Sequence, residues 1–248
     1  MIDRILQQTL EEQLFNGKLL LITGPRQVGK STLLGKIEKV LSKKVLLLNC
    51  DEPDVRELLK TPTSSQLKNL IGTTEVVMID EAQRVKDIGI TLKLAFDNLP
   101  NVQFIVTGSS ALELANEINE PLTGRKFEYH LYPLSIKEMV NHSNSLEVKR
   151  NLQHYLLYGL YPDVINQRGN EKEVLKNLTD SYLYKDVFNF QEVRKPEIFD
   201  KLLKALALQI GSEVSYNELA KTVGSDIQTV QRYLDLLEKT FIVFRLHS

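Results

Sequence analysis

The sequence predicts an α/β protein with a parallel sheet, followed by a helical region and a small module of three helices and a strand. Short apolar runs alternate with segments of helical apolar spacing over residues 1–133, which is typical of a parallel sheet covered by helices. After Pro133 the strand patterns stop, and from Lys195 a third pattern begins. We therefore expect regions at 1–133, 134–194 and 195–248.

The first region is expected to open with a helix and then to supply five strands. Residues 3–16 carry apolar side chains at helical spacing, and Gly17 ends that pattern. Helical patterns also occupy residues 31–41 and 88–98, the second of them closed by Pro100. Four expected strands are the mainly apolar runs at 18–23, 45–49, 75–79 and 102–106, and a fifth is expected at 125–131, before Pro133.

The two remaining regions are predicted to be mainly helical. In the middle region, helices are expected at 134–140, 148–157 and 174–188, with a break at 159–162. In the last region the helices are expected at 196–210, 215–224 and 225–239, followed by a strand at 241–246. Pro at the first turn of the first helix and a Ser-x-x-Glu capping box at Ser215 support the starts of two of them. Three helices and a strand outline a winged helix-turn-helix.

Composition limits the classes of protein to which the chain can belong. The chain has 248 residues, and its net charge of −1 provides no overall field toward nucleic acid or an acidic membrane. The single cysteine, Cys50, excludes a disulfide within the chain and is expected to be a buried apolar residue. No signal-peptide pattern and no apolar run near the ~20 residues of a membrane span are present, so the composition fits a cytosolic protein.

Residues 24–31 read Gly-Pro-Arg-Gln-Val-Gly-Lys-Ser and match the phosphate-loop pattern G-x-x-x-x-G-K-[ST]. In such a loop the backbone N–H groups surround a triphosphate. Lys30 then reaches the β- and γ-phosphates, and the Ser31 hydroxyl ligates Mg²⁺. The alternative is a glycine-rich turn that binds nothing. The expected strand before the motif and helix after it favour the phosphate loop, because the helix start itself attracts anions.

Asp80 and Glu81 follow an apolar run, Val76–Ile79, at the expected end of a strand. An acid at a strand end beside a phosphate loop helps to hold Mg²⁺, which is the role expected for Asp80. An acid one residue further can polarise an attacking water, which is the role expected for Glu81. A solvated acidic turn is the alternative, and the phosphate loop upstream argues against it.

Two further positions are candidates for catalysis. Ser109 or Ser110, at the end of the next expected strand, would lie near the γ-phosphate and orient water, unless the segment is an ordinary turn. Arg125 precedes the fifth expected strand and would neutralise charge developing on the transferred phosphoryl group, or else is a surface arginine. Arg26 lies inside the loop and would brace it or meet a neighbour, and Arg84 is the weakest candidate of the three arginines.

Charge argues against DNA binding by the expected winged helix. Residues 195–248 contain equal numbers of acidic and basic side chains. The expected recognition helix carries three acidic residues, among them Asp226 and Asp235, against two basic ones. Because duplex binding depends largely on neutralising phosphates, a lid or docking module is favoured over a DNA reader. The four histidines have no spacing that suggests a metal site.

Taken together, the motifs resemble those of the prokaryotic AAA+-type ATPases that carry a C-terminal domain of unknown function. The resemblance covers nearly the whole chain. The matching segments are Ile22–Ser31, Ile79–Arg84, Thr107–Ser110, Leu122–Arg125, Leu131–Ser135, Tyr158–Pro162, Tyr182–Asp186 and Tyr233–Thr240. An ordered set of this kind is more specific than any of its members.

The resemblance implies a P-loop NTPase with Mg²⁺ and ATP as ligands and with a sheet order of 5-1-4-3-2, followed by a helical lid and a winged helix. Asp80 and Ser31 then correspond to the metal site, Glu81 and Lys30 to catalytic groups, Ser109 to the sensor and Arg125 to an arginine finger or sensor. The phosphate-loop residues it implies are Gly24, Pro25, Arg26, Gln27, Val28, Gly29, Lys30, Ser31 and Thr32.

One departure from the family pattern concerns the end of the chain. Proteins of this type usually continue past the winged helix into a nuclease-like domain, whereas this chain ends at Ser248, either as a fragment or as a short natural form. Two functions remain open at this point. One is an ATPase whose turnover drives a conformational switch, with assembly into an oligomer if Arg125 acts between subunits. The other is a non-hydrolysing ATP-gated module whose winged helix binds DNA or a protein.

Overall fold

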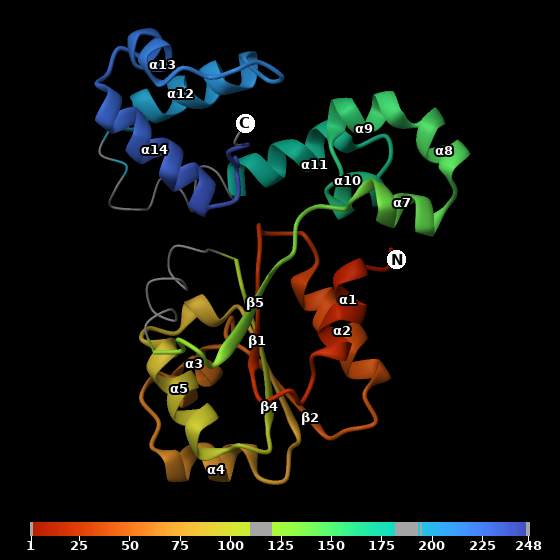
Figure 1. The fold of residues 1–248 in the computed structure, drawn as a ribbon, viewed down its shortest axis with the longest axis vertical. Helices are drawn as coiled ribbons and strands as arrows, with labels where there is room; N and C mark the ends of the chain where they lie inside the picture. Colours follow the sequence, from red (N-terminus) through yellow and green to blue (C-terminus); the bar gives the residue numbers. More distant parts are fainter. Residues whose placement is uncertain (1, 110–120, 182–192, 194, 247–248) are drawn as a thin grey trace. The chain divides into compact units, whose positions relative to one another are not determined.

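The computed structural model describes residues 2–109, 121–181, 193 and 195–246, and Figure 1 shows its fold. The chain divides into two compact units, Met1–Glu171 and Lys172–Ser248. The division into three regions ending at 133, 194 and 248 therefore stays a prediction, since the compact units meet between Glu171 and Lys172. None of the helices in the described part of the chain is long and apolar enough to span a membrane.

The first unit is built on a parallel five-stranded sheet with the order β2-β3-β4-β1-β5. Read from the other edge, this is the order that the resemblance implies. β4 lies between β1 and β3, pairing Ile22 with Thr107 on one side and Ile79 with Val106 on the other. The carboxyl ends of these three strands therefore meet at one edge of the sheet. The strands are β1 (Leu19–Thr23), β2 (Val45–Asn49), β3 (Val76–Asp80), β4 (Gln103–Gly108) and β5 (Lys126–His130).

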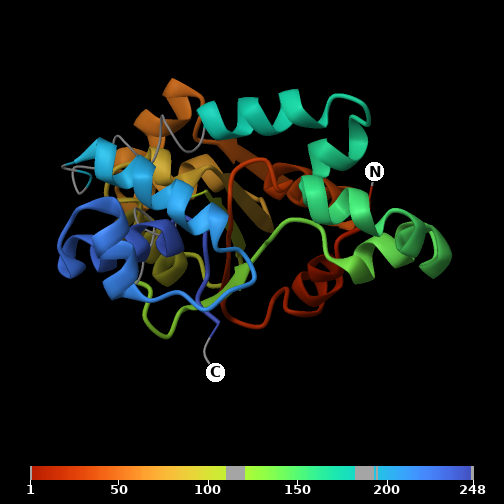
Figure 2. The same cartoon turned by 90° about the horizontal axis from the view of Figure 1, so that it is seen from above.

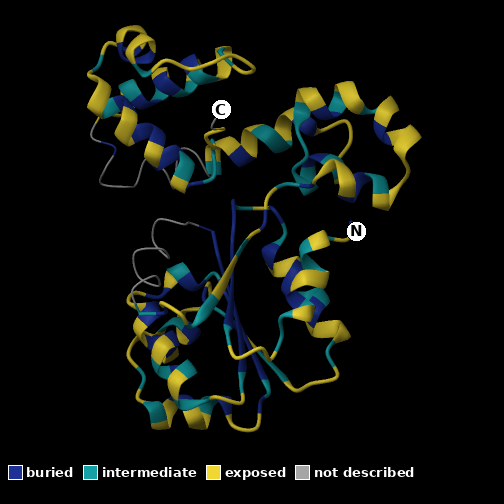
Figure 3. Ribbon diagram, in the orientation of Figure 1, coloured by how far each residue is buried: buried dark blue, intermediate teal, exposed yellow. Residues whose placement is uncertain are grey.

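Helices cover both faces of the sheet. Adjacent residues of β1 point to opposite faces, so that Leu19 and Leu21 join one apolar cluster while Leu20 and Ile22 join another. The central strands are consequently buried along their whole length (Figure 3). One face is covered by α1 (Ile5–Glu12) and α2 (Lys30–Val40), and the other by α3 (Pro53–Lys60), α4 (Ser64–Ile71), α5 (Ile88–Asn98) and the 3₁₀ turn η1 (Ala82–Arg84).

Most elements of this unit agree with the sequence prediction, and two short helices are additional. α3 and α4 occupy residues 53–71, where no element was predicted. α3 begins at Pro53, and α4 begins with a capping box between Thr63 and Gln66. Each has eight residues, too short for a strong periodic signal, and each is held by the apolar contacts of its buried face. Cys50 is fully buried in the same cluster, as expected.

Four short helices complete the first unit, where the sequence predicted two over the same residues. They are α7 (Ile136–His142), α8 (Ser145–Arg150), α9 (Leu152–Tyr158) and α10 (Pro162–Asn166). The break expected near residue 159 is present, because Gly159 ends α9 with a φ of 78°. Ile2 packs into this group against Leu134, Met139 and Tyr155, so the N-terminal segment is part of the helical layer.

The regular elements in the described part of the second unit are helices. α11 (Glu171–Leu178) starts at the boundary, and α12 (Pro196–Leu208), α13 (Tyr216–Val223) and α14 (Ile227–Lys239) form a three-helix group (Figure 2). Tyr233 of α14 is fully buried, its ring meets that of Phe199 edge-on at 5.4 Å, and its hydroxyl accepts the Lys195 N–H at 2.9 Å. Gly224, in the left-handed region, ends α13, and Asp226 caps α14 through the Thr229 N–H.

The strand expected at residues 241–246 was wrong. This segment pairs with no strand in the described part of the chain, and its backbone N–H groups turn back to α14 instead. Ile242 and Val243 both donate to the Leu237 carbonyl, and the Arg245 N–H donates to the Glu238 carboxylate. An apolar run becomes a strand only where another strand accepts its hydrogen bonds, and here the end of a helix accepts them. The third region is therefore a three-helix group, and its identity as a winged helix remains a prediction.

Gly24, at the start of the phosphate loop, lies against the chain that follows β5. Its φ is +156°, and a Cβ placed on it would lie 2.1 Å from the carbonyl oxygen of Leu131. Leu131 cannot move away easily, because its N–H donates to the Thr23 carbonyl at 2.7 Å. The loop thus approaches the neighbouring backbone more closely than any other residue type permits.

We expect Gly24→Ala to lower the free energy of unfolding by about 2 kcal/mol, because both the backbone torsion and the Leu131 carbonyl oppose a methyl group. Gly35→Ala is the matched control, since Gly35 lies within α2 with nothing within 4 Å of an added Cβ, and alanine there should stabilise the helix by up to ~1 kcal/mol. Chemical denaturation of both variants measures the difference. Equal stability of the two would contradict this account of Gly24.

Candidate functional site

The phosphate loop ends at the start of α2, which has no capping side chain. The N-cap position is Gly29, in the left-handed conformation with φ 94°, and no side chain accepts a hydrogen bond there. By contrast, α4 and α7 both begin with complete capping boxes. The first N–H groups of a helix have no acceptor within the helix, so those of Lys30, Ser31 and Thr32 are available to an anion. The residues present therefore fit a bound phosphate.

Lys30 is a buried cation with an exposed fraction of 4%. Its Nζ donates to the carbonyl oxygens of Gly24 at 2.9 Å and Pro25 at 2.8 Å, so the side chain lies along the loop. Burial lowers the pKa of Lys30 to about 8, although the negative charges of Glu81 and Asp80 act in the opposite direction. A bound anion would replace the hydration that this ammonium has lost.

Asp80 ends β3 and is held by the neighbouring strand. The Thr107 hydroxyl of β4 donates to Oδ1 of Asp80, and the Glu81 N–H contacts both that oxygen and the Thr107 hydroxyl oxygen at 3.2 Å. Two of these hydrogen bonds end on Oδ1 and hold the Asp80 carboxylate at the end of β3. Thr107 belongs to a segment that the sequence had singled out, but its contact with Asp80 was not predicted.

Glu81 stands at the turn between β3 and η1, in the left-handed region with φ 53° and ψ 42°. Its carboxylate accepts a hydrogen bond from Gln83, and Gln83 also donates to the Ser109 hydroxyl. Glu81 and Ser109, which the sequence proposed separately, are therefore joined through one amide. Gln83 itself was not predicted to take part in the site. Ser110 lies outside the described residues.

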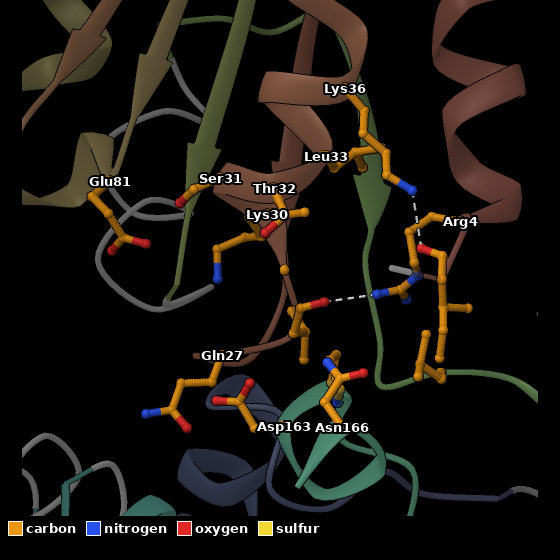
Figure 4. Close-up of a pocket in the computed structure, with 15 residues that line it drawn as sticks. Arg4, Gln27, Lys30, Ser31, Thr32, Leu33, Lys36, Glu81, Asp163 and Asn166 are labelled. Atoms are coloured by element: carbon orange, nitrogen blue, oxygen red, sulfur yellow. Dashed lines mark hydrogen bonds between the residues drawn. The ribbon is translucent and has the colours of Figure 1, made fainter.

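A cavity of about 540 Å³ opens beside the phosphate loop, within the size range of small-molecule sites. Figure 4 shows Lys30, Ser31 and Glu81 along one part of its wall and Gln27, Asp163 and Asn166 along another. The predicted site residues that line it are Gln27, Val28, Gly29, Lys30, Ser31, Thr32 and Glu81, and the additional ones are Ile2, Arg4, Leu33, Lys36, Leu134, Pro162, Asp163 and Asn166. All of these belong to the first unit.

The sequence missed a second wall of this cavity, contributed by the N-terminal segment and by α10. Asp163 and Asn166 of α10 supply a carboxylate and an amide. Lys36 of α2 binds the Ile2 carbonyl at 3.1 Å and the Asp3 carboxylate, which anchors the N-terminal segment beside the loop. The only sequence signal for α10 was the Tyr158–Pro162 segment, which carried the family resemblance without an assigned role.

Arg4 connects three parts of the first unit that are distant in sequence. Its guanidinium donates to the Val28 carbonyl of the phosphate loop at 2.7 Å (Figure 4). It also donates to the Tyr132 carbonyl after β5 and to Glu138 of α7 at 2.9 Å. The Arg4 and Glu138 side chains are only 8% and 6% exposed. This buried ion pair therefore holds the loop, the N-terminal segment and α7 in one arrangement.

Glu138 is ionised in this arrangement. Burial alone would raise the pKa of Glu138, but the N–H groups of Ser135 and Ile5 and the Arg4 guanidinium outweigh burial and lower it below its ordinary value. A carboxyl whose pKa is lowered by folding stabilises the folded state above its unfolded pKa, and this contribution is lost as the pH falls through the folded pKa.

Arg125 lies away from the phosphate loop in the structure of this chain. Its carbonyl accepts the Leu19 N–H at 2.9 Å, which locates it at the start of β1, whereas the phosphate loop follows the end of that strand. The two ends of a strand of this length are about 15 Å apart. Arg125 instead pairs with Asp97 at 2.8 Å, which raises the pKa of Arg125. Whether Arg125 acts within its own subunit or on a second one was left open by the sequence, and its role in catalysis stays a prediction. Arg84 pairs with Asp51 at 3.2 Å.

The donor set fits Mg²⁺ held together with a nucleotide. No group of three or more His, Cys, Asp or Glu able to hold a metal occurs in the part of the chain that the structure describes. Mg²⁺ in phosphate sites is bound by one or two protein oxygens, with phosphate and water completing its octahedron. The Ser31 hydroxyl at the helix start and the Asp80 carboxylate at the end of β3 are oxygens of this kind.

Comparison with known proteins identifies a family and a similar fold. Residues 16–140 match a family model described as an AAA domain, and residues 149–248 match a domain of unknown function (DUF8612). The Walker-type ATPase PABY2304 of Pyrococcus abyssi has a similar fold, with a TM-score of 0.61 at 18% identity, covering 97% of this chain and 90% of that one. At this identity the likeness concerns the fold alone.

Two similar sequences are longer than this chain. An uncharacterized protein of Haemophilus influenzae is 29% identical over 90% of this chain and 61% of its own length. The uncharacterized protein MJ1544 of Methanocaldococcus jannaschii is 24% identical over 99% of this chain and 60% of its own length. The chain thus spans about three fifths of these relatives.

We expect Glu138→Gln to lower the free energy of unfolding by about 3 kcal/mol at pH 7, because it leaves the Arg4 guanidinium buried without a counter-charge. The double variant with Arg4→Met and Glu138→Met should lose less free energy of unfolding than the sum of the losses from Arg4→Met alone and Glu138→Met alone, since no charge is then left unpaired. Chemical denaturation measures both, with the exposed pair Lys60 and Glu57 as a control whose replacement should change stability little. Additive losses would argue against a coupled pair.

Proposed function

This chain belongs to the AAA-domain family, and we propose that it binds Mg-ATP and hydrolyses it to ADP and phosphate. One observation carries the proposal. The uncapped start of α2, the buried Lys30 and the acidic pair Asp80 and Glu81 all meet at the carboxyl edge of the sheet. The matched family and the Walker-type fold support nucleotide binding by this edge.

Binding would use the phosphate loop and the buried lysine together. The N–H groups that open α2 would receive phosphate oxygens, and Nζ of Lys30 would exchange the Gly24 and Pro25 carbonyls for the β- and γ-phosphates. The rest of the nucleotide would extend into the cavity toward α10, where Ile2, Leu134 and Pro162 supply apolar surface. Asp163 and Asn166 would supply the polar contacts there.

Hydrolysis would transfer the γ-phosphoryl group to water. The water oxygen forms a bond to the γ-phosphorus, the bond from that phosphorus to the β,γ-bridging oxygen breaks, and the products are ADP and inorganic phosphate. The Glu81 carboxylate, which lines the cavity, would orient the water and accept its proton. Lys30 would balance the negative charge on the phosphate oxygens, and Ser109 would contact the γ-phosphate.

A bound Mg²⁺ ion would supply positive charge against the negative charge that develops on the phosphate oxygens. Ser31 and Asp80 are the residues that would hold it. The proposed conformational switch follows from the cavity wall: α10 and the phosphate loop line the same cavity, so nucleotide would favour one arrangement of the two. Arg125 would contribute to catalysis only across a contact with a second subunit.

Glu81→Gln should retain ATP binding within about threefold and lower turnover by at least ~100-fold, because the amide cannot accept the proton of the attacking water. Phosphate release measured over a concentration series gives the rate, and titration of a fluorescent ATP analogue gives the affinity. Glu57→Gln is the control, since Glu57 is an exposed carboxylate on α3.

Turnover by Glu81→Gln at the parental rate would remove Glu81 from the mechanism. Binding without turnover in the parental chain, with and without duplex DNA, would instead support the non-hydrolysing ATP-gated module. A rate per subunit that rises with protein concentration would support an active site completed by a second subunit and hence a role for Arg125 in trans.

ATP affinity should weaken as the pH rises above about 8, because the free protein then loses the Lys30 proton that the bound phosphates require. Binding would take up that proton, so the dissociation constant should rise by up to about tenfold per pH unit until the lysine pKa of the complex is reached. Calorimetry in buffers of different ionisation enthalpy measures the proton uptake. The Lys30→Ala variant should bind ATP weakly at every pH and should take up no proton on binding.

A further inference from the structure

Gln83 lies between two residues of the proposed reaction. It belongs to η1, two positions after Glu81. Its Nε2 donates to Oε2 of Glu81 at 2.5 Å and to Oγ of Ser109 at 2.7 Å. Its Oε1 accepts the Ser109 N–H at 3.3 Å. One side-chain amide therefore connects the turn after β3 with the end of β4.

The orientation of this amide follows from its partners. A backbone N–H can only donate and an ionised carboxylate can only accept, so the oxygen must face Ser109 N and the nitrogen must face Glu81. Rotating the amide by 180° would place two acceptors, or two donors, against each other. The network thus specifies a single arrangement of the Gln83 side chain.

The main chain of Glu81 is held separately from its side chain. Its N–H contacts the Thr107 hydroxyl oxygen and Asp80 Oδ1, its carbonyl accepts the Arg84 N–H at 3.0 Å, and its torsions lie in the left-handed region. These contacts set where the side chain begins. Gln83 sets the position of the Glu81 carboxylate, because its side-chain amide donates a hydrogen bond to a carboxylate oxygen of Glu81.

We propose that Gln83 is a positioning residue that holds the Glu81 carboxylate in the nucleotide cavity and ties its position to Ser109. The inference rests on the proposed ATP hydrolysis. The Ser109 hydroxyl accepts from Gln83 and so keeps its own hydrogen to donate to a γ-phosphate oxygen. Contact of Ser109 with the γ-phosphate then orders Gln83 and, through it, the group that takes the proton from water. The catalytic residue remains Glu81.

Gln83→Met tests this, because methionine has a similar length and shape without hydrogen-bonding groups. We expect kcat to fall by about 10- to 100-fold while the dissociation constant of ATP changes less than threefold, since misplacing a catalytic group costs rate and not binding. Gln228→Met, at an exposed position on α14, is the matched control and should leave both values unchanged.

Gln83→Glu is a second variant, close to isosteric, for the case in which Gln83→Met does not fold. A carboxylate there repels Glu81, so the acidic limb of the pH profile of kcat should move to higher pH, which a purely structural defect would not cause. In a double-mutant cycle, the variant with both Ser109→Ala and Gln83→Met should show a smaller fold-decrease in kcat than the product of the two single decreases, because both changes break the same hydrogen bond.

The outcomes separate the two proposals. If the parental chain hydrolyses ATP and both Gln83 variants keep kcat within twofold of it, Gln83 has no positioning role and the proposed function stands. If the fold-decrease in kcat of the double variant equals the product of the decreases caused by Gln83→Met and Ser109→Ala alone, the proposed link between Gln83 and Ser109 is overturned. If the parental chain has no turnover, the proposed function fails and this inference fails with it.

Discussion

The insertion of β4 between β1 and β3 is the constraint on which the rest of the site depends. Because all three strands are parallel, their carboxyl ends reach the same edge of the sheet, which brings the phosphate loop after β1 beside the acids after β3. β4 also supplies the Thr107 hydroxyl that donates to Asp80, and Ser109, the residue directly after β4, supplies the hydroxyl that accepts from Gln83. This strand and the residue that follows it therefore carry the contacts that align both sides of the candidate active site.

Polar groups at this edge are placed where local stability would not put them. Helix α2 begins without the side-chain cap that α4 and α7 possess. Lys30 is a buried cation, and its burial lowers its pKa. Glu81 adopts a left-handed conformation that is unusual for a residue other than glycine. Departures of this kind from local preference concentrate at functional sites, because the surrounding structure must hold them in place. Here that support comes from the central strands, which are buried along their whole length, and from the Arg4–Glu138 pair.

The parts of the fold that could be predicted are those with local signals. Four of the five strands follow from apolar runs, and the phosphate loop follows from a motif whose backbone geometry requires Gly24 and Gly29. α3 and α4 could not be predicted in the same way, since each is short and depends on contacts with the rest of its cluster. The strand expected at residues 241–246 failed for a related reason, because pairing with another strand, and not apolar content alone, makes a strand.

By itself the sequence determined the α/β class, the phosphate loop, and the candidacy of Lys30, Asp80 and Glu81, because each depends on residues adjacent in the chain. Only the tertiary structure decided which distant groups meet them. It joined Arg4 to Glu138 and placed α10 on the wall of the cavity. It showed that Arg125 lies at the amino ends of the strands, away from the phosphate loop, and it connected Glu81 to Ser109 through Gln83. Hydrogen bonds between groups so far apart along the chain leave no periodicity in it, and they exist only once strand pairing has brought those groups together.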